Sequence, residues 1–144
     1  MESHGVALLD LGRELRAAGY RFVTPSPETH RRVNARKGSA AGASATDIFG
    51  WSRPFPQEAL PAHWIDLMER GEVLESQGNM LASKVRFSSL GPALFMHSAY
   101  PTNGADAVFF GPDTYRFVRL ATDGLARRPA PRRIVDVGCG SGAG

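Results

Sequence analysis

Several features are missing from this chain of 144 residues, and each absence excludes a class of protein. Cys139 is the only cysteine, so no internal disulfide can form, and a reducing cytoplasm is the simplest setting. No stretch approaches about eighteen consecutive apolar residues, so we expect no membrane-spanning helix. The first residues lack the basic and apolar regions of a signal peptide. The histidines are scattered without metal-ligand spacing, and we expect no metal site.

Composition and charge give a weaker indication of partners. A hydrophobic content of 42% with 22% charged residues is ordinary for a globular domain with its own core. The net charge of +3 permits contact with nucleic acid without requiring it. Basic residues gather at positions 30–37 and 126–133, where they could contact RNA or another anionic substrate. A solvated surface explains both clusters equally well.

Apolar residues three or four positions apart predict helices in the first half of the chain. The predicted helices are residues 8–18 ended by Gly19, residues 27–36 begun by Ser26 as N-cap, and residues 60–70 ended by Gly71. Residues 39–46 are small and polar, which predicts a linker. The aromatic residues between positions 49 and 64 are interpreted as core.

After Gly71 the apolar pattern changes to a period of two, which predicts strands. Residues 73–75 and 80–87 are the first two, joined by a turn at positions 76–79, and residues 93–99 are a third. Lys84 and Arg86 are expected on the opposite side of the strand from Val85 and Phe87.

The clearest motif is I-V-D-V-G-C-G-S-G-A-G at residues 134–144. Branched apolar residues around Asp136 are typical of the end of a buried parallel strand. Gly138, Gly140 and Gly142 then alternate with small residues, a spacing that allows a sharp turn close to a ligand. Cys139 is interpreted as a small filler, since no base can be assigned to it.

This D-x-G-x-G-x-G pattern resembles motif I of class I S-adenosylmethionine-dependent methyltransferases. The resemblance implies that the glycines and Cys139 lie beside the amino-acid end of S-adenosylmethionine and that Asp136 helps position its ammonium group. Two other interpretations stay open. Gly138, Gly140 and Ala143 also satisfy the dinucleotide-binding fingerprint, although Asp136 would repel a pyrophosphate. A Gly/Ser-rich tail without a ligand is the third.

A second segment, V-F-F-G-P-D-T-Y-R-F at residues 108–117, precedes a predicted helix that runs to position 125. Its order is similar to the region before motif I in methyltransferases acting on ring or amide nitrogens, including RNA guanine and release-factor glutamine enzymes. The resemblance implies that Phe110, Pro112, Asp113 and Thr114 shape the cofactor pocket. A helix capped by Asp113 or Thr114 beside a buried Phe110 explains the same residues.

Together these patterns predict an α+β protein. Helices followed by a hairpin resemble a winged helix-turn-helix and the accessory domain of some bacterial methyltransferases, so residues 1–104 are expected to form a winged-helix-like accessory domain. Within residues 62–70, Asp66 and Glu69 would be unfavourable beside DNA phosphates, so this helix suits packing or substrate presentation better than DNA reading. Residues 105–144 are expected to be the first elements of a truncated Rossmann-like domain. Its strand at 134–137, without sheet neighbours, should be disordered, swapped or paired with a second copy, so an oligomer is possible.

The function predicted from these resemblances is methyl transfer from S-adenosylmethionine to a nitrogen of RNA or protein. The motif ends before any downstream catalytic residue, so catalytic residues stay unassigned and the fragment alone is expected to be inactive. A non-enzymatic winged-helix module that binds nucleic acid is one alternative. The start of an NAD-dependent dehydrogenase is the other.

Overall fold

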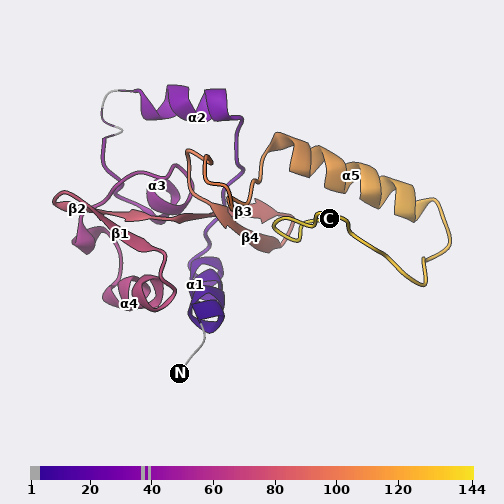
Figure 1. Ribbon diagram of the computed structural model, residues 1–144, viewed down its shortest axis with the longest axis horizontal. Coiled ribbons are helices and arrows are strands. Elements are labelled where there is room, and N and C mark those ends of the chain that lie inside the picture. The colour runs from indigo at the N-terminus through magenta and orange to yellow at the C-terminus, as the bar shows by residue number, and fades with distance from the viewer. Residues whose placement is uncertain (1–3, 37, 39) are drawn as a thin grey trace.

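The chain combines helices with two antiparallel hairpins, as the computed structural model shows for residues 4–36, 38 and 40–144 (Figure 1). The helices are α1 (His4–Ala17), α2 (Pro27–Asn34), α3 (Ala45–Phe49), the short 3-10 helix η1 (Gln57–Ala59), α4 (Ala62–Arg70) and α5 (Pro112–Ala126). The strands are β1 (Leu74–Gln77), β2 (Met80–Ser83), β3 (Val85–Leu90) and β4 (Ala93–Ser98). The α+β class is confirmed. In this described part, no helix is long and apolar enough to cross a membrane.

Helices α1 and α4 form the centre of the core. Leu11 and Leu15 of α1 are fully buried, and α1 packs against α4, which buries four of its own apolar side chains. The prediction that the aromatic residues of this region are core is confirmed for Phe49, Phe55 and Trp64. Gly71 ends α4 as predicted, but its φ is −81°. Its requirement for glycine is spatial, since a Cβ there would lie 2.6 Å from Leu8 Cδ2.

The predicted linker at residues 39–46 is only partly correct, because α3 begins within it. Ser44 caps this helix and accepts a hydrogen bond from the Asp47 backbone N–H at 3.2 Å. The Asp47 carboxylate in turn accepts from the Ser44 hydroxyl at 2.8 Å. Ser-x-x-Asp is close to a capping box, and that spacing would have predicted the helix start. For α2, the predicted Ser26 N-cap is confirmed.

The predicted strand at residues 80–87 is wrong, because it divides at Lys84 into two strands of different hairpins. The Ser83 hydroxyl accepts from the Val85 N–H at 3.2 Å and donates to the Val85 carbonyl at 2.8 Å. These local bonds replace part of the ladder and let the chain change sheets. The β1–β2 turn is also tighter than predicted, since Gln77 pairs directly with Met80 across Gly78, whose φ is +64°.

Both faces of β3 are covered. Phe87 packs beneath α1, where a Cβ at Gly12 would lie 3.5 Å from its ring. Arg86 points the other way, towards His30 of α2, and is equally buried. The predicted alternation is therefore correct, but it does not separate a core face from a solvent face.

Helix α5 projects from the body formed by the other elements (Figure 1). It begins at Pro112 with Gly111 as N-cap, two or three residues before the predicted caps, and Thr114 Oγ1 accepts from the Gly111 N–H at 3.3 Å. The predicted strand at residues 134–137 is absent, and Val137 is 90% exposed. In the described residues no parallel sheet is formed, so the segment has no neighbouring strand to satisfy its backbone groups.

Core packing between α1 and α4 makes a specific prediction for Leu11. L11A should lower the free energy of unfolding by about 2–5 kcal/mol, because it leaves a cavity where the side chain is fully buried. L9A is the matched control on the same helix, where the side chain is 53% exposed, and should change stability by no more than about 0.5 kcal/mol. Urea denaturation of both variants measures the difference. Equal losses would contradict this packing.

Candidate functional site

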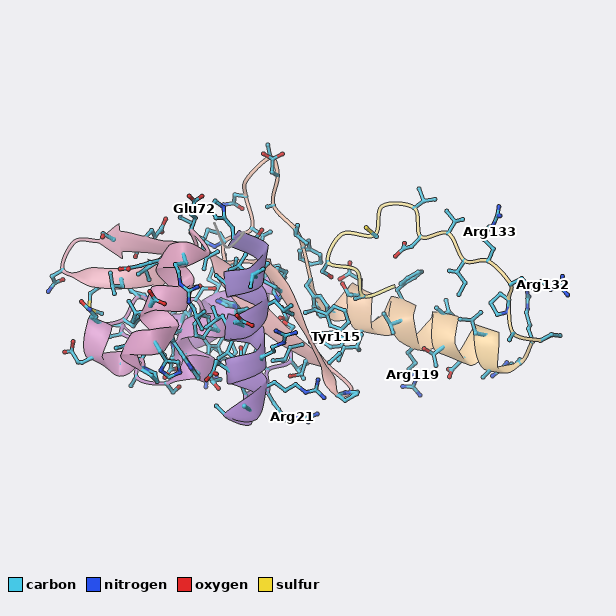
Figure 2. All side chains as sticks on the ribbon, turned by 90° about the horizontal axis from the view of Figure 1, so that it is seen from below. Arg21, Glu72, Tyr115, Arg119, Arg132 and Arg133 are labelled. Atoms are coloured by element: carbon cyan, nitrogen blue, oxygen red, sulfur yellow. The ribbon has the colours of Figure 1, made fainter. Side chains whose placement is uncertain are left out.

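The two segments singled out by their sequence lie together at the start of α5. The chain after α5 turns at Arg132 and Arg133 and runs back along the helix, so the glycine loop reaches its N-terminus (Figure 2). A cavity of about 270 Å³ lies between them. This acidic cavity is lined by Phe109, Asp113, Thr114, Phe117, Asp136, Gly138, Cys139, Gly140, Ser141, Ala143 and Gly144.

The lining of the acidic cavity selects for positive charge. Asp113 and Asp136 both contribute to it, and no Lys, Arg or His is among its lining residues. Phe109 and Phe117 add aromatic surface that is largely exposed. Carboxylates attract an ammonium or sulfonium group, and aromatic faces also attract cations. A pyrophosphate would meet repulsion here without a compensating basic side chain.

The loop requires its glycines for backbone conformation rather than for space. Gly138, Gly140 and Gly142 have φ values of +75°, +53° and +74°, in the left-handed region that other residues rarely adopt. A Cβ at Gly138 or Gly142 would meet nothing within 4 Å. The Gly142 N–H donates to the Cys139 carbonyl at 2.8 Å and closes the turn.

The cavity brings together some of the predicted cofactor residues and leaves out others. Those that line it are Asp113, Thr114, Asp136, Gly138, Cys139 and Gly140. Pro112 and Gly142 flank it without lining it, and Phe110 turns away into the core. Phe109 and Phe117 were not predicted, although both lie in the quoted aromatic segment. Ligand contact by any of these residues stays a prediction.

Phe110 instead joins α5 to the body. Its fully buried ring stacks on His97 at 5.2 Å and on Phe95 at 5.8 Å between centroids, and Tyr115 of α5 meets it edge-on at 5.2 Å. Tyr115, seen at the junction in Figure 2, also accepts a hydrogen bond from the Thr24 N–H at 3.1 Å. The ring therefore positions the start of α5.

A second cavity, of about 300 Å³, lies between α2, β3 and the loop after β4. This arginine cavity is lined by Thr24, Pro25, Pro27, His30, Arg86, Tyr100, Pro101, Thr102, Asn103, Phe109 and Phe110. Its lining contains no Asp or Glu. Burial lowers the pKa of Arg86 to about 10, so the guanidinium stays charged at neutral pH. Phe109 lines both this cavity and the acidic one.

Hydrogen bonds and burial determine which ring nitrogen of His30 carries the proton and keep the ring neutral. His30 Nε2 lies 2.9 Å from the Trp51 carbonyl, which can only accept, so this nitrogen carries the proton. Its Nδ1 then faces Arg86 Nη1 at 3.5 Å as an acceptor, and the ring stacks on Tyr100 at 4.2 Å. Burial, reinforced by the Arg86 charge, lowers the pKa of His30 to about 4. His30 is therefore neutral beside the cation.

His97 belongs to the same buried polar network. Its Nε2 hydrogen-bonds the Ser88 hydroxyl at 2.7 Å, and that hydroxyl also meets Thr24. Burial, with a smaller contribution from Arg86, lowers the pKa of His97 to about 3. Both buried histidines are thus held without charge.

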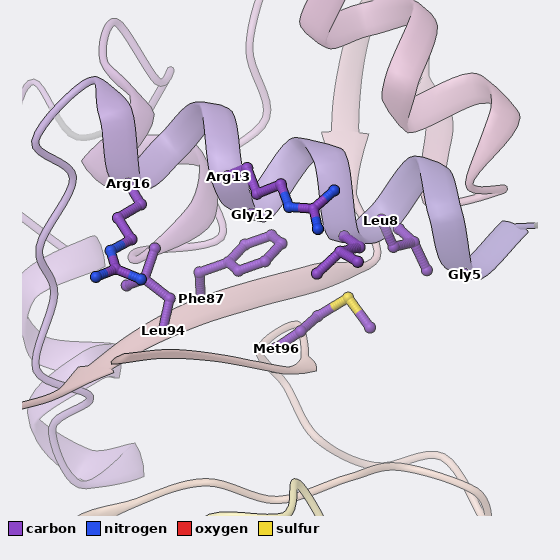
Figure 3. A pocket seen from close by; sticks show the side chains of 9 residues that line it. Gly5, Leu8, Gly12, Arg13, Arg16, Phe87, Leu94 and Met96 are labelled. Carbon is purple, nitrogen blue, oxygen red and sulfur yellow. The ribbon is translucent and has the colours of Figure 1, made fainter. Parts of the chain in front are cut away.

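A third hollow, of about 340 Å³, lies between α1 and the β3–β4 hairpin (Figure 3). Apolar side chains form most of it, including Leu8, Phe87 and Met96, with Arg13 and Arg16 at its rim. No Asp or Glu lines this hollow, and no residue of the glycine loop lines it. Across the residues that the structure describes, no group of three or more His, Cys, Asp or Glu could hold a metal ion.

The buried histidines predict loss of stability in acid. An unfolded histidine binds a proton near pH 6.5, whereas His30 and His97 in the folded protein do so only near 4 and 3. As the pH falls from about 6.5 to about 5, the unfolded state alone takes up protons, and the free energy of unfolding falls by up to about 1.4 kcal/mol per pH unit for each histidine. Urea denaturation across this range measures the slope. H30Q/H97Q should flatten it, and an unchanged slope would count against neutral buried histidines.

Comparison with known proteins identifies no family for this chain. No protein-family model, no curated protein and no solved structure matches the chain. The functional argument therefore depends on the residues themselves.

Proposed function

We propose that this chain is the N-terminal part of a class I methyltransferase that uses S-adenosylmethionine. One observation carries the proposal: residues of two separate segments, 113–114 and 136–140, line a single cavity that has two carboxylates and no basic side chain. The volume of about 270 Å³ is slightly below the roughly 300–1,000 Å³ of ligand pockets. It suits the cationic amino-acid end of the cofactor.

Each residue of the acidic cavity has a role in this proposal. Asp136 holds the ammonium group of the cofactor, and the left-handed glycines let the backbone approach it without side chains. Thr114 fixes the first turn of α5 through its bond to Gly111, so that Asp113 stays at the cavity. When bound, S-adenosylmethionine supplies an electrophilic methyl group. The protein contributes position and orientation more than acid–base chemistry.

The exposed apolar surfaces of the C-terminal region support a larger catalytic domain. None of the residues of α5 is buried, and Phe117, Leu120 and Leu125 are exposed on it. Ile134, Val135 and Val137 are exposed as well. Large contiguous apolar exposure marks an interface. We infer that residues 134–137 become a parallel strand, with α5 beside it, when further strands of a Rossmann-like sheet cover them.

The body of the protein would then be a winged-helix-like accessory domain. Helix α4 is followed directly by the β1–β2 hairpin, the order expected for a helix and its wing. α4 buries Trp64, Ile65, Leu67 and Met68, while Asp66 pairs with Arg70 at 2.9 Å. Such a helix suits packing or substrate presentation better than reading a DNA groove.

The methyl acceptor in this proposal is a nitrogen of RNA or protein. On α2, Arg31 and Arg32 both pair with Glu28, which reduces the positive charge available to phosphates and weakens the case for a simple nucleic-acid-binding module. The arginines around residues 127–133 are exposed beyond α5 and could guide an anionic acceptor (Figure 2). A dehydrogenase start is disfavoured by the two carboxylates of the acidic cavity.

Isothermal titration calorimetry of the full-length protein tests the cofactor. S-Adenosylmethionine and its demethylated product should both release or absorb heat, and NAD should not. D136N should weaken binding about tenfold or more, because a hydrogen bond between charged groups is lost. D123N removes an exposed acid of α5 outside the cavity and is the matched control.

The proposal fails if neither form of the cofactor gives a heat signal. It fails equally if D123N weakens binding as much as D136N, because the effect would then reflect net charge rather than the cavity.

A further inference from the structure

A buried cation without an acidic partner lies in the body of the protein. Arg86 is 2% exposed, and within residues 4–36, 38 and 40–144 no Asp or Glu forms an ion pair with it. Arg53 shows the usual arrangement, since its side chain is only 13% exposed and its guanidinium pairs with the Asp47 carboxylate. A buried charge is costly unless it is paired, so the absence of a carboxylate at Arg86 requires a physical explanation.

The hydrogen bonds of Arg86 leave most of its donors unused. Its Nε–H donates to the Ser98 carbonyl at 3.1 Å, which fixes the plane of the guanidinium. Nη1 has only the 3.5 Å contact with His30 Nδ1, and Nη2 has no partner in the described part of the chain. The two Nη groups form the fork that binds a carboxylate or phosphate through parallel hydrogen bonds.

The cavity around this fork is suited to negative charge. Tyr100 and Asn103 line it, and neither the Tyr100 hydroxyl nor the Asn103 side-chain amide has a hydrogen-bond partner among the described residues. Both groups can donate. His30 completes the wall as a neutral ring held by Trp51. The lining therefore has one cation, unused donors and no carboxylate.

We propose that the arginine cavity binds a small oxyanion, a carboxylate or a phosphate, between the Nη groups of Arg86 and the side chains of Tyr100 and Asn103. The anion supplies the partner that the folded chain lacks. The rest of a larger ligand has room as well, because the cavity volume of about 300 Å³ is larger than that of a single carboxylate or phosphate group.

The position of the site indicates which molecule carries the oxyanion. Phe109 lines the arginine cavity and the acidic cavity alike. A ligand anchored at Arg86 therefore lies in a cavity that shares one lining residue with the acidic cavity. On this basis the oxyanion belongs to the methyl acceptor, and this assignment, unlike the anion site itself, rests on the proposed function.

Nuclear magnetic resonance titration with inorganic phosphate and with acetate tests the site directly. At constant ionic strength, with chloride as the reference, the Arg86 Nε–Hε signal and, in every variant, the Asn103 side-chain amide signals should shift and saturate, and the preferred anion should raise the melting temperature. Stronger binding of phosphate identifies a phosphorylated ligand, and stronger binding of acetate identifies a carboxylate. R86M should weaken binding about tenfold or more, and R86K should retain part of it, because lysine keeps the charge without the fork.

R21M is the matched control, because Arg21 is an exposed arginine outside this cavity (Figure 2). It should bind both anions like the wild type. The absence of saturation with either anion would overturn the site, as would equal weakening by R21M and R86M. If R86M does not fold, the wild-type titration and R86K decide the question. Phosphate or acetate binding without a cofactor signal would refute the methyltransferase proposal alone, and the reverse result would refute this site alone.

Discussion

The buried ring of Phe110 is the contact on which the candidate sites depend. It joins β4 to α5 through its stacking on His97 and Phe95 and its edge contact with Tyr115. Each aromatic pair of this kind adds about 0.5–1.5 kcal/mol beyond the area it buries. Because α5 buries none of its own residues, these contacts and the Tyr115–Thr24 hydrogen bond hold its first turn in place. The acidic cavity therefore depends on an aromatic anchor at one end of a helix rather than on a sheet.

Two cavities of opposite charge meet at the neighbouring residue, Phe109. One has Asp113 and Asp136 with no basic lining residue, and the other has Arg86 with no acidic one. Each cavity would attract the ion that the other repels. This arrangement suits two ligands held side by side, one positive and one negative, which is what a transfer reaction between a cationic donor and an anionic acceptor needs.

Periodicity in the sequence predicted α1 and α4 well, because one face of each of these helices is apolar, and it located the hairpin region without the bounds of its strands. It failed where side chains act on the backbone: Ser83 bonds both polar groups of Val85 and divides the predicted strand, and Ser44 starts a helix inside the predicted linker. The segments of the acidic cavity were recognisable from glycine spacing and the Pro-Asp-Thr run. The arginine cavity was not recognisable. Alternation along β3 predicts on which face Arg86 lies, but it does not predict that α2 covers that face. The branched residues at 134–137 predicted a strand that is absent, because a strand forms only beside another.

The burial of Arg86 is difficult to explain by stability. An ion buried without a partner costs several kcal/mol, and an apolar side chain of similar length would fill the same space without that cost. The surrounding residues reduce the cost only in part: Ser98 accepts one hydrogen bond, and His30 is kept neutral so that it adds no repulsion. The Ser98 hydrogen bond also fixes the plane of the guanidinium fork, and no acid lines the cavity around it. Local rules of stability are broken in proteins mainly at functional sites. A cation that is oriented and unpaired at the wall of a cavity therefore has the properties of a binding group.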